Sequence, residues 1–170
     1  MNPRCFPVPL RGQRAKLIES FASRRNSHED SAIGTRRDRK GPLAHLTTLN
    51  KDGSPQVTVI WVGIEGEEFV IGHLALHQKI KNIRRDPRVA LSFIGQNTSK
   101  EGMREYVVAY GRARITEGGA VPLLRRLAPI YLGPGAVYPP ASMQNIAGYL
   151  NRITPDRFSG IGPWAAKSGE

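Results

Sequence analysis

The sequence predicts a mainly β protein, a small closed or nearly closed antiparallel barrel with helices inserted between its strands. Three observations lead to this fold class. Several runs are rich in Val, Ile, Thr and Trp, as β-strands are. Short turns join these runs, among them one with the pair Asp52 and Gly53, which is typical of a hairpin. Glycines stand inside the strand patterns at Gly72, Gly111 and Gly160, where we expect a bend, a bulge or a ligand close to the backbone.

Six strands are expected after residue 41. The first two form the hairpin around the Asp-Gly turn, and each later strand follows a turn, a loop or a helix. The expected strands are 43–50, 55–63, 68–74, 88–94, 104–116 and 152–162. Helical patterns occupy 77–86, 120–132 and 141–150. Pro87 ends the first helix, because the residue before a proline is pushed out of the helical region.

The length of 170 residues suits one folded domain. The distribution of charged residues along the chain indicates separate segments. Residues 1–41 hold ten Arg and Lys against four Asp and Glu, a net charge of +6, and several prolines and glycines interrupt them. We expect a basic, loosely ordered N-terminal arm with one short helix at 13–24. The barrel domain then spans 42–162, and 163–170 form a C-terminal tail.

The composition excludes several classes of protein. No apolar run is long enough to cross a membrane, and no secretory signal follows the basic start, so a cytoplasmic protein with no membrane partner is expected. The single cysteine, Cys5, and four histidines without ligand spacing predict no metal site. Hydrolase and dinucleotide motifs are absent, so a cofactor is expected to carry any chemistry. The formal net charge of +11 favours an anionic partner.

The segment 77–88 holds five Lys and Arg and one acidic residue. At its start, free backbone N–H groups of a helix combine with His77 and Lys79, which together suit an anion such as a cofactor's phosphate. The alternative interpretation is a helix face that is simply solvated.

Four segments, in this order, carry a resemblance to a known superfamily: 45–72, 77–93, 105–116 and 152–162. The most specific is the run Lys-x-x-Asn-hydrophobic-Arg-Arg-Asp-Pro-Arg that begins at Lys79. Together they resemble the flavin and deazaflavin oxidoreductases of the FMN-binding split β-barrel superfamily. The nearest group is similar to the pyridoxamine 5'-phosphate oxidase-like enzymes that use the deazaflavin coenzyme F420. The resemblance covers about residues 40–162.

The resemblance implies a six-stranded antiparallel split β-barrel that forms a homodimer, with two cofactor sites at the subunit interface. Lys79 matches the lysine that binds the cofactor phosphate, and its compact charge suits that role. His77 stands where the family usually has arginine, which makes one phosphate contact sensitive to pH. Asn82 would bind either the phosphate or the loop that supports it.

The resemblance also implies where the cofactor ring lies. Gln56, Thr58 and Ile60 alternate on one face of the second strand, along which the family's isoalloxazine-type ring is placed. The other ring contacts implied are Gly72 and His73, at the end of the third strand, and Tyr106, contributed by the other subunit. Alternatively, Gln56 and Thr58 are ordinary barrel residues, His73 is an ordinary strand histidine, and Tyr106 only packs at the interface.

The function implied is hydride transfer between coenzyme F420 and an unsaturated small organic substrate. The proton would come from His73, Tyr106, Tyr110 or water, and the segments 95–103 and 117–150 would shape the substrate entrance. FMN on the same fold is the alternative cofactor, and a non-catalytic cofactor carrier remains open. A nucleic-acid-binding barrel is disfavoured, because the strands lack the paired aromatics that stack on bases.

Overall fold

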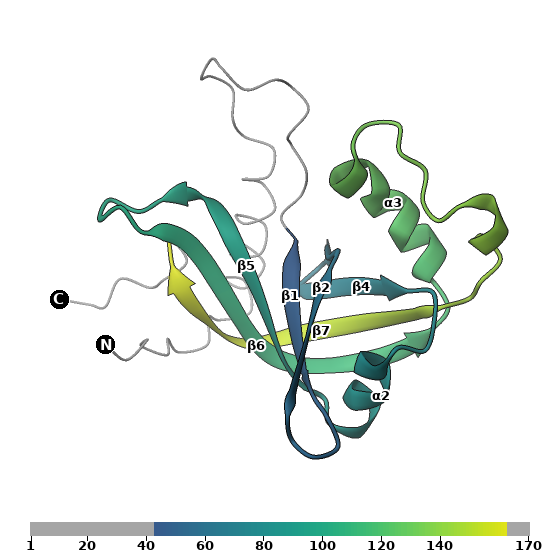
Figure 1. The fold of residues 1–170 in the computed structure, drawn as a ribbon, viewed down its shortest axis with the longest axis horizontal. Coiled ribbons are helices and arrows are strands. Elements are labelled where there is room, and N and C mark those ends of the chain that lie inside the picture. The colour runs from purple at the N-terminus through teal and green to yellow at the C-terminus, as the bar shows by residue number, and fades with distance from the viewer. Residues whose placement is uncertain (1–42, 163–170) are drawn as a thin grey trace.

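Residues 43–162 fold into one antiparallel β-sheet around an apolar core, with two α-helices packed against it (Figure 1). The structure is a computed structural model, and these are the residues that it describes. The predicted arm 1–41 and the predicted tail 163–170 lie outside the described residues. Within the described range, no helix has the length and apolar character needed to cross a bilayer.

The elements follow one another with short connections. The strands are β1 (Ala44–Leu49), β2 (Pro55–Ile60), β3 (Gly63–Glu65), β4 (Glu68–His73), β5 (Arg88–Thr98), β6 (Arg104–Glu117) and β7 (Tyr149–Ile161). The helices are α2 (Gln78–Arg85) and α3 (Ala120–Leu132), and one 3₁₀ turn, η1, spans Ala141–Met143.

The strand order is β2-β1-β5-β6-β7-β4-β3, and every neighbouring pair is antiparallel. The two edge strands, β2 and β3, are consecutive in the chain, and only Trp61 and Val62 separate them. The two edges of the sheet are therefore joined by a two-residue corner of the chain itself. This architecture confirms the expected mainly β fold with inserted helices.

The apolar core lies on the inner face of the curved sheet. One row across the strands runs through Ile60, Ala44, Phe93 and Val107, which are register partners and almost inaccessible to solvent. Helix α2 contacts β1 and β6 and adds Ile83 to the same core cluster. Apolar burial on alternate strand positions thus fixes which face of each strand points inward.

The expectation of six strands is wrong by one, because the expected strand 55–63 divides at Trp61 and Val62 into β2 and β3. The hydroxyl of Tyr131, on α3, accepts a hydrogen bond from the Val62 N–H and donates one to the Val62 carbonyl, both at 3.0 Å. The Trp61 ring stacks on the Tyr131 ring, with centroids 5.2 Å apart. The backbone of Val62 is thus satisfied by a side chain instead of a strand.

The expected helix 141–150 is also wrong. Its first residues form only the turn η1, and Tyr149 already pairs with His73 at the start of β7. Gly148, with φ at +63°, lies so close to β4 that an added Cβ would stand 2.5 Å from the His73 carbonyl oxygen. Strand pairing therefore overrides the local helical pattern.

Other local predictions are confirmed. In the expected hairpin, the Asn50 N–H donates to the Ser54 carbonyl at 2.8 Å, and Gly53 has φ at +84°. The register between β6 and β7 shifts at Gly111, where an added Cβ would stand 2.2 Å from the Thr154 carbonyl oxygen. Glycine is therefore required at this bulge.

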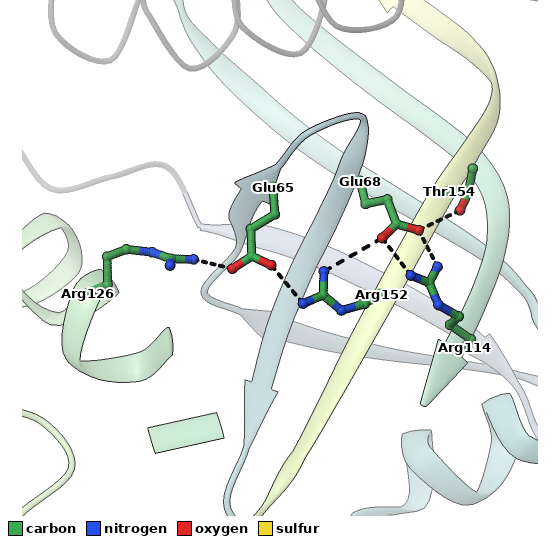
Figure 2. Close-up of polar contacts among 6 residues, drawn as sticks. All are labelled: Glu65, Glu68, Arg114, Arg126, Arg152 and Thr154. Carbon is green, nitrogen blue, oxygen red and sulfur yellow. Dashed lines mark hydrogen bonds and ion pairs between the residues drawn. The ribbon is translucent and has the colours of Figure 1, made fainter. Parts of the chain in front are cut away.

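A chain of ion pairs joins α3 to four strands (Figure 2). Glu65 accepts from Arg126 at 2.5 Å and from Arg152 at 2.8 Å. Glu68 contacts Arg152 at 3.7 Å and also pairs with Arg114. These arginines lower the pKa of both carboxyl groups. The network therefore connects elements that are far apart in the sequence.

Candidate cofactor site

The start of helix α2 presents groups that attract an anion. The first helical hydrogen bond is donated by the Ile80 N–H to the His77 carbonyl at 3.0 Å, so the N–H groups of Gln78 and Lys79 precede the hydrogen-bonded turn. His77 is the N-cap residue, but its side chain makes no capping hydrogen bond, and the first turn holds no acidic residue. The positive end of the helix dipole adds to this character.

Lys79 extends from this turn to strand β2. Its Nζ donates a hydrogen bond to Thr58 Oγ1 at 3.2 Å, which joins two of the residues predicted to contact the cofactor. The ammonium group is half-buried, and this burial lowers its pKa from 10.5. Within residues 43–162 no carboxylate forms an ion pair with it. A desolvated cation with no counter-ion in the described chain is well suited to bind an anion.

His73 ends β4 next to these groups. Its ring is 5% exposed, and its centroid lies 6.0 Å from the ring centroid of the exposed His77. Burial, and after it the charges of Lys79 and His77, lower the pKa of His73 to about 3. The imidazole is therefore neutral near pH 7, so it can orient a ligand by hydrogen bonding but does not hold a proton to donate as an imidazolium ion.

Asn82 lies one turn after Lys79 and is completely buried. Its amide nitrogen is close to three side-chain oxygens of the β1–β2 hairpin, at 3.1 Å from Thr48, 3.0 Å from Asn50 and 3.0 Å from Gln56. Its oxygen accepts from Gln78 at 2.9 Å. Of the two roles expected for Asn82, these contacts match support of the site, since they fix α2 against the strand that carries Thr58.

The remaining inner residues have structural neighbours. Gln56 belongs to the Asn82 network, and its oxygen also accepts from the Thr48 hydroxyl at 3.2 Å. Ile60 is 6% exposed and is part of the apolar core. Gly72 faces α3, where an added Cβ would stand 3.1 Å from Leu124. Gly72 therefore allows close packing of a helix on β4.

Tyr106 lies away from this group in the same chain. It pairs with Ile94 of β5 and alternates with the buried Val107, so it points to the outer face of the sheet. Thr58 instead lies on the inner face, in register with the buried Leu46. One subunit therefore brings together Thr58, His73 and Lys79 but leaves Tyr106 on the other face.

Sequence analysis did not identify three polar residues near the site. Thr48 and Asn50 complete the Asn82 network, and Asn151 of β7 is fully buried in register with Ile71. The signal for Thr48 is the alternation on β1, where Thr48 follows Ala44 and Leu46 at the next position of the buried face. Asn151 fell between the expected helix and the expected strand, so no pattern assigned it to the interior.

The residues present fit a phosphate-bearing cofactor. The half-buried Lys79 and the uncapped start of α2 suit the phosphate. The Nε2 atom of His73 is buried and has no hydrogen-bond partner among the described residues, so a group from outside these residues, a ligand atom or a water, is needed to satisfy it.

Comparison with known proteins agrees with this fold. A family model described as Pyridoxamine 5'-phosphate oxidase matches residues 39–142, more than half of the chain. A solved structure named F420 reductase is 25% identical with a TM-score of 0.56, and the match covers 77% of this chain and 98% of that one.

Two further solved structures share the fold. A conserved hypothetical protein from Mycobacterium tuberculosis is 21% identical, with a TM-score of 0.56 over 100% of this chain and 99% of that one. An FAD-binding protein from Mesorhizobium loti is 19% identical, with a TM-score of 0.51 over 71% of this chain and 85% of that one. No curated protein matches the sequence. The chain therefore belongs to the pyridoxamine 5'-phosphate oxidase family and has its FMN-binding split-barrel fold.

Proposed function

We propose that this protein is an oxidoreductase that binds the deazaflavin coenzyme F420 and uses it to reduce an unsaturated small organic substrate. The observation that carries the proposal is the Lys79 ammonium, held against Thr58 at the uncapped start of α2 without a counter-ion in the described chain. The relative named F420 reductase supports this choice of coenzyme.

In this proposal, the residues of the chain bind the coenzyme and position it. Lys79 and the N–H groups at the start of α2 neutralise the phosphate, and the Thr58 hydroxyl, which already accepts from Lys79, orients the adjoining polar chain. Neutral His73 offers a hydrogen bond at the inner edge of the site. When bound, the reduced deazaflavin supplies the hydride. Because His73 is neutral, the proton comes from water or from a tyrosine.

The site is completed by a second copy of the chain. The outer face of the sheet exposes apolar side chains, with Val57 58%, Val59 55% and Ile94 55% exposed. Tyr106 lies beside Ile94 on this face. A homodimer formed through it would bury these residues and bring Tyr106 toward the partner's site.

A paired fluorescence titration with F420 and with FMN tests the function. We expect F420 to bind more tightly than FMN, and Lys79→Ala to weaken F420 binding at least tenfold without loss of fold, because one charge-assisted contact contributes about 1.5–3 kcal/mol.

The matched control is Lys81→Ala, which removes the same charge from an exposed position on the same helix. An equal loss in both variants would show that only the net charge matters. Tighter binding of FMN, with a yellow purified protein, would instead assign the site to a flavin. That second candidate is favoured by the match to the pyridoxamine 5'-phosphate oxidase family model.

A further inference from the structure

Two buried side chains near the site hold polar atoms that no residue within 43–162 satisfies. They are His73, through Nε2, and Asn151, through both its amide nitrogen and its amide oxygen. Asn151 is 0% exposed and His73 is 5% exposed. A buried polar atom without a partner loses its hydrogen bonds to water and gains none in return, so a pair of such side chains needs an explanation.

The register of the sheet places these side chains next to each other. In the β4–β7 pair, His73 lies opposite Tyr149 and Ile71 lies opposite Asn151. His73 and Ile71 are two residues apart and therefore share a face, so His73 and Asn151 are diagonal neighbours on the inner face. On its other side, Asn151 is in register with Ile115 of β6. Two of its diagonal neighbours in the sheet are polar, His73 on β4 and Glu117 on β6. Glu117 is largely exposed and pairs with Arg84, so His73 is the buried polar neighbour that remains for the amide.

The two side chains are not hydrogen-bonded to each other, since the Asn151 atoms and His73 Nε2 all lack a partner. Diagonal neighbours in a sheet are about 7–8 Å apart at the backbone, which leaves room for one small molecule between polar ends that do not touch. Such a molecule must both donate and accept, because an amide offers both functions and an imidazole nitrogen offers one of them. Water meets these requirements.

We propose that His73 and Asn151 bind one internal water molecule between them, and that Asn151 thereby acts as a positioning residue for the His73 ring. Asn151 orients the water, and the oriented water at Nε2 fixes which nitrogen of the neutral ring carries the proton. The other ring nitrogen, Nδ1, then donates to a ligand or accepts from it accordingly. The consequence for cofactor binding rests on the proposed function, whereas the hydration site itself does not.

The test uses the unliganded full-length protein and two variants. A high-resolution crystal structure should contain a water within hydrogen-bond distance of His73 Nε2 and of the Asn151 amide. Nitrogen-15 NMR should show a single neutral tautomer of His73. Asn151→Leu should produce a mixture of tautomers and weaken F420 binding at least threefold, whereas Asn151→Ser, which keeps a hydroxyl and room for water, should restore most of both.

A dry gap in the crystal structure would overturn the proposal, and so would a His73 tautomer that is unchanged in Asn151→Leu. If Asn151→Leu does not fold, two results still test the hydration site. They are the electron density of the natural protein between His73 and Asn151, and the nitrogen-15 NMR spectrum of Asn151→Ser. If F420 does not bind the natural protein at all, the proposed function fails, while the crystal and NMR results still judge the hydration site.

Discussion

His73 shows how burial determines the chemistry of a single residue. A histidine beside a cofactor phosphate would ordinarily titrate near neutral pH and provide a proton. Here burial, with Lys79 and His77 nearby, holds its pKa at about 3. Sequence analysis placed the residue correctly at the end of a strand, but it had no access to the depth of burial that excludes the charged form.

The buried His73 makes folding stability depend on pH. The unfolded chain binds a proton at this residue near pH 6.5, whereas the folded protein binds it only near pH 3. The folded state therefore loses stability as the pH falls below 6.5, by about 2 kcal/mol at about pH 5. His73→Phe should remove this contribution, so urea unfolding at about pH 7.5 and pH 5 should show a smaller loss than in the natural protein.

The other ionisable groups are present in both proteins, so the difference between the two pH dependences isolates His73. The same loss of stability on acidification in both proteins would contradict a buried neutral histidine. The comparison does not depend on the absolute stability of the variant, which the change in ring shape will also alter.

At the scale of elements, the patterns of the sequence predicted those elements whose signals are local. The Asp-Gly hairpin, helix α2 ended by Pro87 and the long strand β6 were all recognised in this way. The predictions are wrong where a contact with an element far away in the sequence determines the local structure. The break after β2 depends on Tyr131, about seventy residues later in the chain, and the start of β7 depends on pairing with β4. Local propensity carries no information about such partners.

The contact between Tyr131 and the β2–β3 corner should matter for stability. Tyr131→Phe removes the hydroxyl that satisfies both backbone groups of Val62 while it keeps the ring that stacks on Trp61. We expect a loss of about 1–3 kcal/mol in the free energy of unfolding, measured by urea denaturation.

Tyr138→Phe is the matched control, because the Tyr138 ring also contacts Trp61, edge-on at 5.3 Å, and no hydrogen bond of its hydroxyl occurs within residues 43–162. The free energy of unfolding of Tyr138→Phe should fall by no more than about 0.5 kcal/mol. Equal losses in the two variants would show that the hydroxyl of Tyr131 does not hold the corner.

At the scale of the whole molecule, the ion-pair network joins α3 to four strands. Glu68→Gln removes the partner of Arg114 and Arg152. We expect a destabilisation of about 0.5–1 kcal/mol at low salt that shrinks in about 1 M NaCl, because salt screens partly exposed charges. Since the arginines lower the pKa of Glu65 and Glu68, acidification below about pH 4.5 should likewise remove this stabilisation.

Glu67→Gln provides the control for this prediction, since Glu67 is adjacent in the chain and forms no ion pair in the part that the structure describes. Unfolding curves in urea at both salt concentrations give the comparison. A loss for Glu68→Gln that is independent of salt would indicate lost packing or the lost Thr154 hydrogen bond.

The proposed homodimer is also a property of the whole molecule. Light scattering should give twice the mass of the 18.7 kDa chain for the natural protein and the mass of one chain for Val59→Arg, which places a charge among the exposed apolar side chains of the outer face. The control Val137→Arg changes a residue that is 76% exposed in the segment after α3 and should remain dimeric. A natural protein with the mass of one chain would refute the dimer.

Strand β7 has a consequence for how the chain is made. It lies between β6 and β4, so it is the strand that connects β2-β1-β5-β6 with β4-β3. It is also the last strand along the part of the chain that the structure describes, at Tyr149–Ile161. During synthesis, the first six strands leave the ribosome before the strand that unites them. We therefore expect the sheet to be completed only when residue 161 has emerged, so the two groups of strands on either side of β7 join late and not progressively during synthesis.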